Sequence, residues 1–315
     1  MVRSSSVDTL KVILFLLVVL GHINTPFHNY IYAFHMPAFF FLSGFLMKNM
    51  RLDSTQKDFI NLIVPFLIFS ILGICVELIK RIVLGREFPD FYRMLHGIYI
   101  SFDSTVSYYG FVLWFLPVLF LVKILARVII NRINSRLILF ILSSCTLYFF
   151  KDFNFSLPFF LGINKVIITL PFFIFGYLYK GVHARNGFLT VFLSLIISSS
   201  IIYFFSTPYF DIGSSIVDYY GVSIFFPVFL VTMLLALLGV LERSFDINSE
   251  YIQLLASFSM LFFVFHPYTN NISHLIILSF DVDFWLWKFI LSIVLLLIIC
   301  FFKKRKSNWI IFKYV

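Results

Sequence analysis

Residues 8–22 read DTLKVILFLLVVLGH, and residues 32–47, after a short polar break, read YAFHMPAFFFLSGFLM. Both segments are apolar enough to lie in a bilayer, yet they carry Asp8, Lys11, His22 and His35. An ionisable side chain at the centre of a spanning helix costs at least about 2.5 kcal/mol, so such residues usually face the interior of a helix bundle and mark a site or a pathway. His22 is therefore the first candidate for a functional residue.

The spacing of these residues predicts a shared helix face. Lys11 and His22 are eleven residues apart, which on an α-helix is about three turns, with about 20° of phase difference and about 16 Å along the axis. Asp8 precedes Lys11 by three residues, a spacing that allows an ion pair. Lys11 could instead be a snorkelling residue that anchors the inner end of the helix.

The composition indicates an integral membrane protein. The chain has 315 residues, of which 61% are hydrophobic and 12% charged, and its mean hydropathy is +1.00. Soluble domains are about 25% charged. We interpret residues 1–315 as one membrane domain, and the net charge of +9 as membrane topology and contact with anionic lipid, not as a nucleic-acid surface. Cys75, Cys145 and Cys300 have no metal-ligand spacing, so we predict no metal site.

A spanning helix needs about twenty apolar residues, and this length predicts an all-α bundle of about ten transmembrane helices. The candidates are residues 9–28, 30–47, 59–79, 108–124, 137–150, 158–179, 187–205, 219–241, 252–275 and 284–302. With both termini cytoplasmic, the 24 basic residues lie on the inner side except for Lys80, Arg81, Arg86, Arg93, Lys151, Lys165 and Lys288. This bias favours cytoplasmic termini, and the composition suits a bacterial inner membrane.

The same topology predicts a layer of polar side chains in the outer half of the bilayer. His22, His35, Trp114, Lys165 and His266 fall at similar depths. Prolines follow three of these positions, in HMP, FLP and FHP, and they should break or kink their helices. Each residue also has a structural alternative: His266 could mark a helix kink with a solvated side chain, and Lys165 could form an ion pair with Glu77.

Three further features have structural interpretations. Gly44, in SGF, is expected to form a notch that lets a neighbouring helix approach closely. The FFF and PFF runs are interpreted as surface facing lipid. The segment REFPDFYRMLHG in the loop 80–107 could form a short helix along the membrane interface.

Five blocks of the chain resemble the membrane-bound acyltransferase 3 family. They are DTLKVILFLLVVLGH, FHMPAFFFLSGFL, YGFVLWFLPVLF (109–120), LPFFIFGYLYKG (170–181) and FHPY (265–268). The nearest group is similar to fucose 4-O-acetylase and related sugar O-acetyltransferases. The resemblance implies about ten spanning helices and transfer of an acyl group, usually acetyl from cytoplasmic acetyl-CoA, to a hydroxyl of an extracytoplasmic or lipid-linked saccharide.

The family signature is a basic residue, typically Arg, and a His with ten residues between them. Lys11 and His22 occupy these positions, and lysine lacks the planar fork of arginine. Some members have an Arg-x-Arg pair after the second helix, where this chain has only Arg51 and Lys57.

The sequence therefore predicts an O-acetyltransferase of surface polysaccharide or lipid-linked sugar, with acetyl-CoA as co-substrate. Histidine suits a general base near neutral pH, and His22 takes that role. Asp8 and Lys11 would serve at the inner mouth or on the phosphates of CoA, with Arg51 and Lys57 as further point charges. His35, Trp114, Lys165 and His266 are assigned to the acceptor. A transporter or flippase for a lipid-linked or small polar substrate is the alternative, although the matching halves typical of transporters are not visible.

Overall fold

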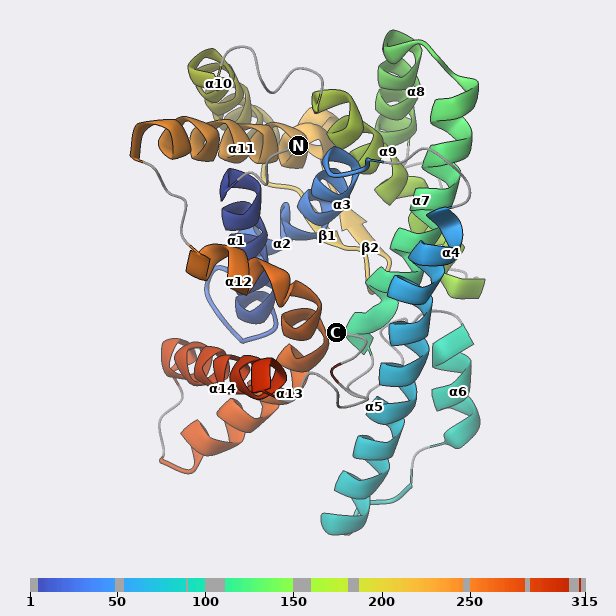
Figure 1. Cartoon of the computed structure of the whole chain (residues 1–315), viewed down its shortest axis with the longest axis vertical. Helices are drawn as coiled ribbons and strands as arrows, with labels where there is room; N and C mark the ends of the chain where they lie inside the picture. Colours follow the sequence, from blue (N-terminus) through green and yellow to red (C-terminus); the bar gives the residue numbers. More distant parts are fainter. Residues whose placement is uncertain are drawn as a thin grey trace.

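The computed structural model describes residues 5–48, 54–88, 90–99, 111–149, 160–180, 187–245, 250–280, 284–305 and 312. The described part of the chain is a bundle of helices with one small hairpin (Figure 1). The first half contains α1 (Ser5–Gly21), α2 (His28–Tyr32), α3 (His35–Phe45), α4 (Thr55–Asp58), the π-helix η2 (Phe59–Ile63), α5 (Val64–Val83), α6 (Phe91–Tyr99), η3 (Phe111–Trp114), α7 (Phe115–Arg132) and α8 (Arg136–Tyr148). The second half contains η5 (Phe160–Gly162), α9 (Ile163–Tyr179), α10 (Gly187–Phe205), β1 (Tyr209–Asp211), β2 (Ile216–Asp218), η6 (Gly221–Phe225), α11 (Phe226–Phe245), α12 (Glu250–Ser257), α13 (Ser259–Leu278) and α14 (Trp285–Arg305).

The helices long enough to cross a membrane are fewer than predicted. Within the described residues, six helices are long and apolar enough, or seven if α12 and α13, which meet at a 68° bend, count as one broken span. α1 has 17 residues and α3 has 11, which correspond to about 26 and 16 Å of helix, less than a bilayer core of about 30 Å. A multi-pass membrane protein is confirmed, and the number of ten spans is not.

The N-terminal hairpin is where the helices differ most from the prediction. The first segment ends at Gly21, the short helix α2 follows, and Phe34, with φ −151°, interrupts the chain before α3. Pro37 has no N–H to donate to the carbonyl four residues earlier, at Ala33, which is consistent with a break at this point. Pro37 and Pro117 both lie in the first turn of their helices, where proline is tolerated.

α1 and α3 lie at the centre of the bundle (Figure 1). α1 packs against α11, α12 and α13, and α3 packs against α9 and α11. The FFF run, at Phe39–Phe41, is 8, 0 and 1% exposed, and Phe172 and Phe173 of the PFF run in α9 are fully buried. The expectation that these runs face lipid is therefore wrong for these residues, because they fill the protein core.

The contact between α3 and α9 depends on glycine from both helices. A Cβ atom on Gly44 would lie 1.9 Å from the Phe173 carbonyl oxygen, and one on Gly176 would lie 1.8 Å from the Phe41 carbonyl oxygen. The two backbones are therefore in direct contact. This confirms that Gly44 forms a packing notch, and it identifies α9 as the partner helix.

A two-stranded hairpin that the sequence analysis did not anticipate lies beside α2. β1 and β2 pair antiparallel, with Phe210 opposite Val217, and β1 contacts α2. Phe210 is fully buried, with its ring 5.8 Å from that of Phe172. The hairpin is thereby held over the centre of the bundle. The predicted short helix in the loop 80–107 is present as α6.

Candidate active site

Two of the predicted histidines are in contact. His22 directly follows α1, and its ring stacks on the ring of His266 in α13, with centroids 5.0 Å apart and planes at 30°. His266 is fully buried, whereas His22 is exposed. His35 is 2% exposed and lies across Tyr32, whose ring centroid is 4.8 Å from that of His35 and 6.5 Å from that of His22. The structure thus brings His22, His35 and His266 into one cluster.

The proline after His266 explains the orientation of this side chain. Pro267 cannot donate to the carbonyl of Phe263, four residues earlier, and His266 Nδ1 approaches this oxygen to 2.8 Å and that of Phe262 to 3.2 Å. A carbonyl oxygen only accepts, so Nδ1 carries the hydrogen and Nε2 is the basic nitrogen of the neutral ring. Nε2 is buried and has no hydrogen-bond partner among the described residues.

His35 has the same arrangement. Its Nδ1 donates to the carbonyl oxygen of Ile31 at 2.8 Å, one turn earlier, which again leaves Nε2 as the basic nitrogen. The two buried histidines are therefore held in one tautomer by backbone carbonyls. His22 is the member of the cluster that combines contact with another imidazole and an exposed surface.

Asn270 links the two helices that carry the histidine pair. Its Nδ2 donates to the carbonyl oxygen of Val19 at 3.0 Å, one of the last carbonyls of α1, which have no partner within the helix. Its Oδ1 accepts from Ser292 Oγ of α14 at 2.5 Å, and Thr269 Oγ1 lies 2.8 Å from the same hydroxyl. This buried network fixes α13 against the end of α1, next to His22.

Replacing Asn270 by leucine, which has a similar size and no amide, is expected to reduce acyl transfer about tenfold and to destabilise the protein by about 1–3 kcal/mol, because Val19 O and Ser292 Oγ lose a buried partner. Initial rates and thermal unfolding in detergent measure the two effects. Asn271→Leu, at the next and more exposed position, is the matched control. Equal losses in both variants would contradict a specific role of Asn270.

The hairpin joins the histidine cluster to a second group of predicted residues. Tyr209 of β1 stacks on Tyr32 at 5.4 Å, and His28 stacks on Tyr32 at 4.2 Å. Burial and the neighbouring charge of Asp211 raise the pKa of Tyr209, so this phenol stays neutral and able to donate a hydrogen bond. The aromatic side chains of α2 and β1 thus form one wall beside His35.

Trp114 and Lys165 lie at the other end of the hairpin. Lys165 Nζ donates to the Gly213 carbonyl oxygen at 2.8 Å and lies 5.3 Å from the centroid of the Trp114 ring. A Cβ atom on Gly213 would lie 2.6 Å from Trp114 Nε1, so any larger residue there would displace the indole ring. Glu77, the alternative partner of Lys165, forms ion pairs with Lys80 and Arg81 of its own helix.

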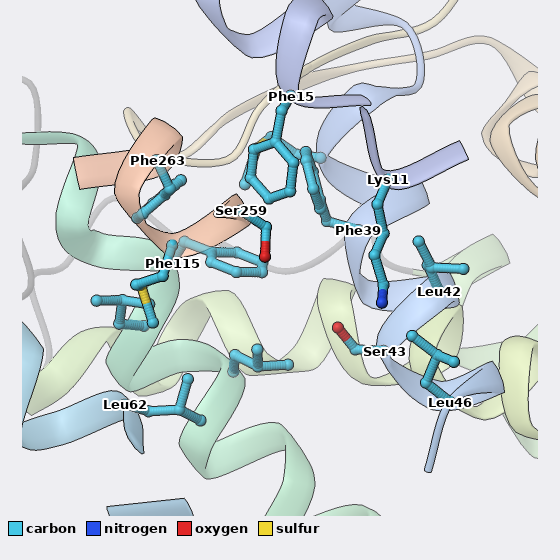
Figure 2. Close-up of a pocket in the computed structure, with 14 residues that line it drawn as sticks. Lys11, Phe15, Phe39, Leu42, Ser43, Leu46, Leu62, Phe115, Ser259 and Phe263 are labelled. Carbon is cyan, nitrogen blue, oxygen red and sulfur yellow. The ribbon is translucent and has the colours of Figure 1, made fainter. Parts of the chain in front are cut away.

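The inner end of the predicted site opens into a cavity. Lys11 Nζ lies 3.3 Å from Asp8 Oδ1, which confirms the ion pair expected from the sequence. The same amine points into a cavity of about 180 Å³, together with the hydroxyls of Ser43 and Ser259 (Figure 2). Lys11 therefore lines the cavity with its amine.

Phenylalanine rings form the end of this cavity nearest the histidines. Phe15, Phe39, Phe115 and Phe263 all line it, and successive ring centroids in that order are 5.0, 5.9 and 5.4 Å apart. The ring of Phe263 is also 6.2 Å from that of His266, one turn later in α13. The cavity thus extends from the Asp8–Lys11 pair to a layer of rings in contact with the histidine cluster.

Lys57, another predicted cofactor-binding residue, does not line the cavity. Lys57 is exposed in α4, five residues before Leu62, which does line the cavity. Arg51 lies outside the described residues.

A comparison with protein families decides the class of the protein. A family model described as an acyltransferase domain, that of the acyltransferase 3 family, matches residues 4–305. The chain belongs to this family. No curated protein and no solved structure shows a significant match. The resemblance inferred from the sequence blocks is therefore confirmed at the level of the family, and the similarity to fucose 4-O-acetylase remains a prediction.

Membership of the acyltransferase 3 family makes the chain a membrane acyltransferase with some acceptor substrate. Several residues around the histidine cluster of this acyltransferase were given no site role from the sequence: Tyr32, Tyr209, Asp211, Asn270 and Phe263. Asn270 had a signal in the sequence, because PYTNN places polar residues immediately after His266 within an apolar segment. Tyr209 and Asp211 had none, since they reach the site through the hairpin.

Proposed function

We propose that this acyltransferase moves an acetyl group from cytoplasmic acetyl-CoA to a hydroxyl of an extracytoplasmic or lipid-linked saccharide in a bacterial inner membrane. The observation that carries the proposal is the cavity between the Asp8–Lys11 pair and the rings beneath His22 and His266. A basic group near the inner end and a histidine cluster near the outer end suit a donor and an acceptor that approach from opposite sides.

The chemistry assigns His22 as general base. It takes the proton of the acceptor hydroxyl as the oxygen attacks the thioester carbonyl carbon. The C–S bond then breaks, an ester forms, and the proton leaves His22 for the departing thiolate. His22 suits this role because it is the most exposed of the three histidines, so an acceptor hydroxyl reaches it first.

The remaining predicted residues divide between the two substrates. Lys11 acts on the donor as a point charge, because lysine offers no bidentate fork, and Asp8 holds its amine in place. His266, through Nε2, and His35 receive hydrogen bonds from the acceptor or orient His22. Trp114 and Lys165 bind on the acceptor side of the site. Lys165 contacts both the hairpin, at the Gly213 carbonyl, and the ring of Trp114.

Membrane vesicles of defined orientation test this function. Radiolabelled acetyl-CoA, which does not cross membranes, is supplied either to inside-out or to right-side-out vesicles that contain the protein and bacterial surface saccharides. We expect base-labile label on carbohydrate when acetyl-CoA meets the cytoplasmic face, and background levels from the other face. Transfer from the outer face would contradict the direction. If carbohydrate stays unlabelled in both orientations while another acceptor is labelled, the proposal that the acceptor is a saccharide would be contradicted.

A further inference from the structure

The cavity-lining face of α7 continues into two cationic side chains. Leu116 and Leu119 line the cavity, and Lys123 and Arg127 follow Leu119 by four and eight residues, which on a helix keeps them on about the same face. They lie about 6 and 12 Å farther along the axis, away from Phe115 and the histidine end. The positive-inside prediction places both on the cytoplasmic side.

The end of α4, which runs directly into η2, supplies a carboxylate to both cations. Leu62 of η2 lines the cavity, and Asp58 precedes it by one turn. Lys123 Nζ lies 2.6 Å from Asp58 Oδ1, and Arg127 Nη2 donates to Asp58 Oδ2. Two positive charges share one negative charge, so the cluster of Asp58, Lys123 and Arg127 carries a net positive charge.

Arg127 has more donors than this cluster uses. The residue is 3% exposed, and its Nε and Nη1 are buried without a hydrogen-bond partner among the described residues. An ion pair that only holds α7 against the end of α4 uses one nitrogen of the guanidinium and leaves two donor nitrogens buried without a partner among the described residues, at a cost in free energy. A second anion beside Asp58 would satisfy them, and guanidinium groups bind phosphate well.

We propose that Lys123 and Arg127 bind a phosphate group of the acyl donor at the inner approach to the cavity, in competition with Asp58. This inference rests on the proposed function, since it takes a CoA thioester as the donor. Asp58 holds the two cations in place when the donor is absent. On binding, the phosphate shares them with Asp58 and accepts hydrogen bonds from Nε and Nη1 of Arg127.

Coenzyme A without an acyl group is the probe, titrated by calorimetry into the full-length protein in lipid nanodiscs. We expect Arg127→Gln to raise the dissociation constant at least tenfold. Arg132→Gln removes the same charge from the exposed end of the same helix and should change it less than twofold. Asp58→Asn should lower the dissociation constant several-fold, because it removes the competing carboxylate.

The Asp58→Asn variant separates a ligand site from a structural clamp. A clamp alone predicts that losing the carboxylate weakens folding and leaves CoA affinity unchanged or reduced, so tighter binding supports the site. If wild-type protein binds CoA and all three variants bind it equally, this inference is wrong and the proposed donor stands. If wild-type protein binds no CoA, the proposed donor is wrong and this inference fails with it.

Discussion

Replacing His22 by alanine is expected to lower the rate of acyl transfer by about 10²–10⁴-fold, the usual contribution of a general base. The substitution removes an exposed side chain, so protein level, membrane insertion and thermal stability should remain close to those of the wild type. Initial rates with labelled acetyl-CoA, and immunoblots of the membrane fraction, measure the two properties.

His274→Ala is the matched control for this experiment. His274 is exposed in the same helix as His266 and two turns beyond it, so its loss should change the rate less than twofold. His266→Ala is informative beside it, because it removes the ring that stacks on His22. Substantial transfer by His22→Ala protein would exclude His22 as the base.

The histidine cluster could be predicted because burying a polar group in an apolar segment is costly. His22, His35 and His266 interrupt apolar runs, and such residues almost always face the interior of a bundle or a water-filled cavity. Counting residues along each predicted helix placed them at one depth, and they do meet. The prediction used the ten-helix topology, which is not confirmed, and the three histidines meet although α1 ends at Gly21, before His22, and α3 begins only at His35.

The number of spanning helices could not be predicted in the same way. An apolar run looks alike in sequence whether lipid or protein surrounds it. Phe40 and Phe41 are surrounded by protein, because they lie in the core at the centre of the bundle. The helix that carries them, α3, has only 11 residues. A hydropathy window therefore counts a short, fully packed helix as a membrane span.

The hairpin shows a second limit. Lys165 Nζ donates a hydrogen bond to the backbone carbonyl of Gly213, 48 residues away. Every residue has a backbone carbonyl, so the pattern of side chains does not indicate which carbonyl will bind the lysine. Sequence analysis assigned Lys165 to the acceptor, with an ion pair to Glu77 as the structural alternative, whereas in the structure the hairpin turn supplies a carbonyl oxygen and Trp114 supplies a ring face. Contacts made by backbone carbonyls require the fold to be known.

Replacing Gly44 by alanine is expected to destabilise the protein by about 3 kcal/mol, more than most single methyl insertions. The new Cβ would lie 1.9 Å from the Phe173 carbonyl oxygen, a backbone atom that no rotamer change can move. α3 and α9 must then separate, and the midpoint of thermal unfolding in detergent should fall by about 5 °C or more.

Gly176→Ala should have an effect of similar size, since its Cβ would meet the Phe41 carbonyl oxygen from the opposite helix. Gly187→Ala is the matched control, because the nearest atom there, at 3.0 Å, belongs to the Val240 side chain, which can turn away. Because α3 begins at His35, separation of α3 from α9 also displaces that histidine, and acyl transfer should fall together with stability. If the Gly44→Ala protein unfolds at the wild-type temperature, the two backbones are not in contact. The claim that the contact between α3 and α9 positions His35 would then be wrong.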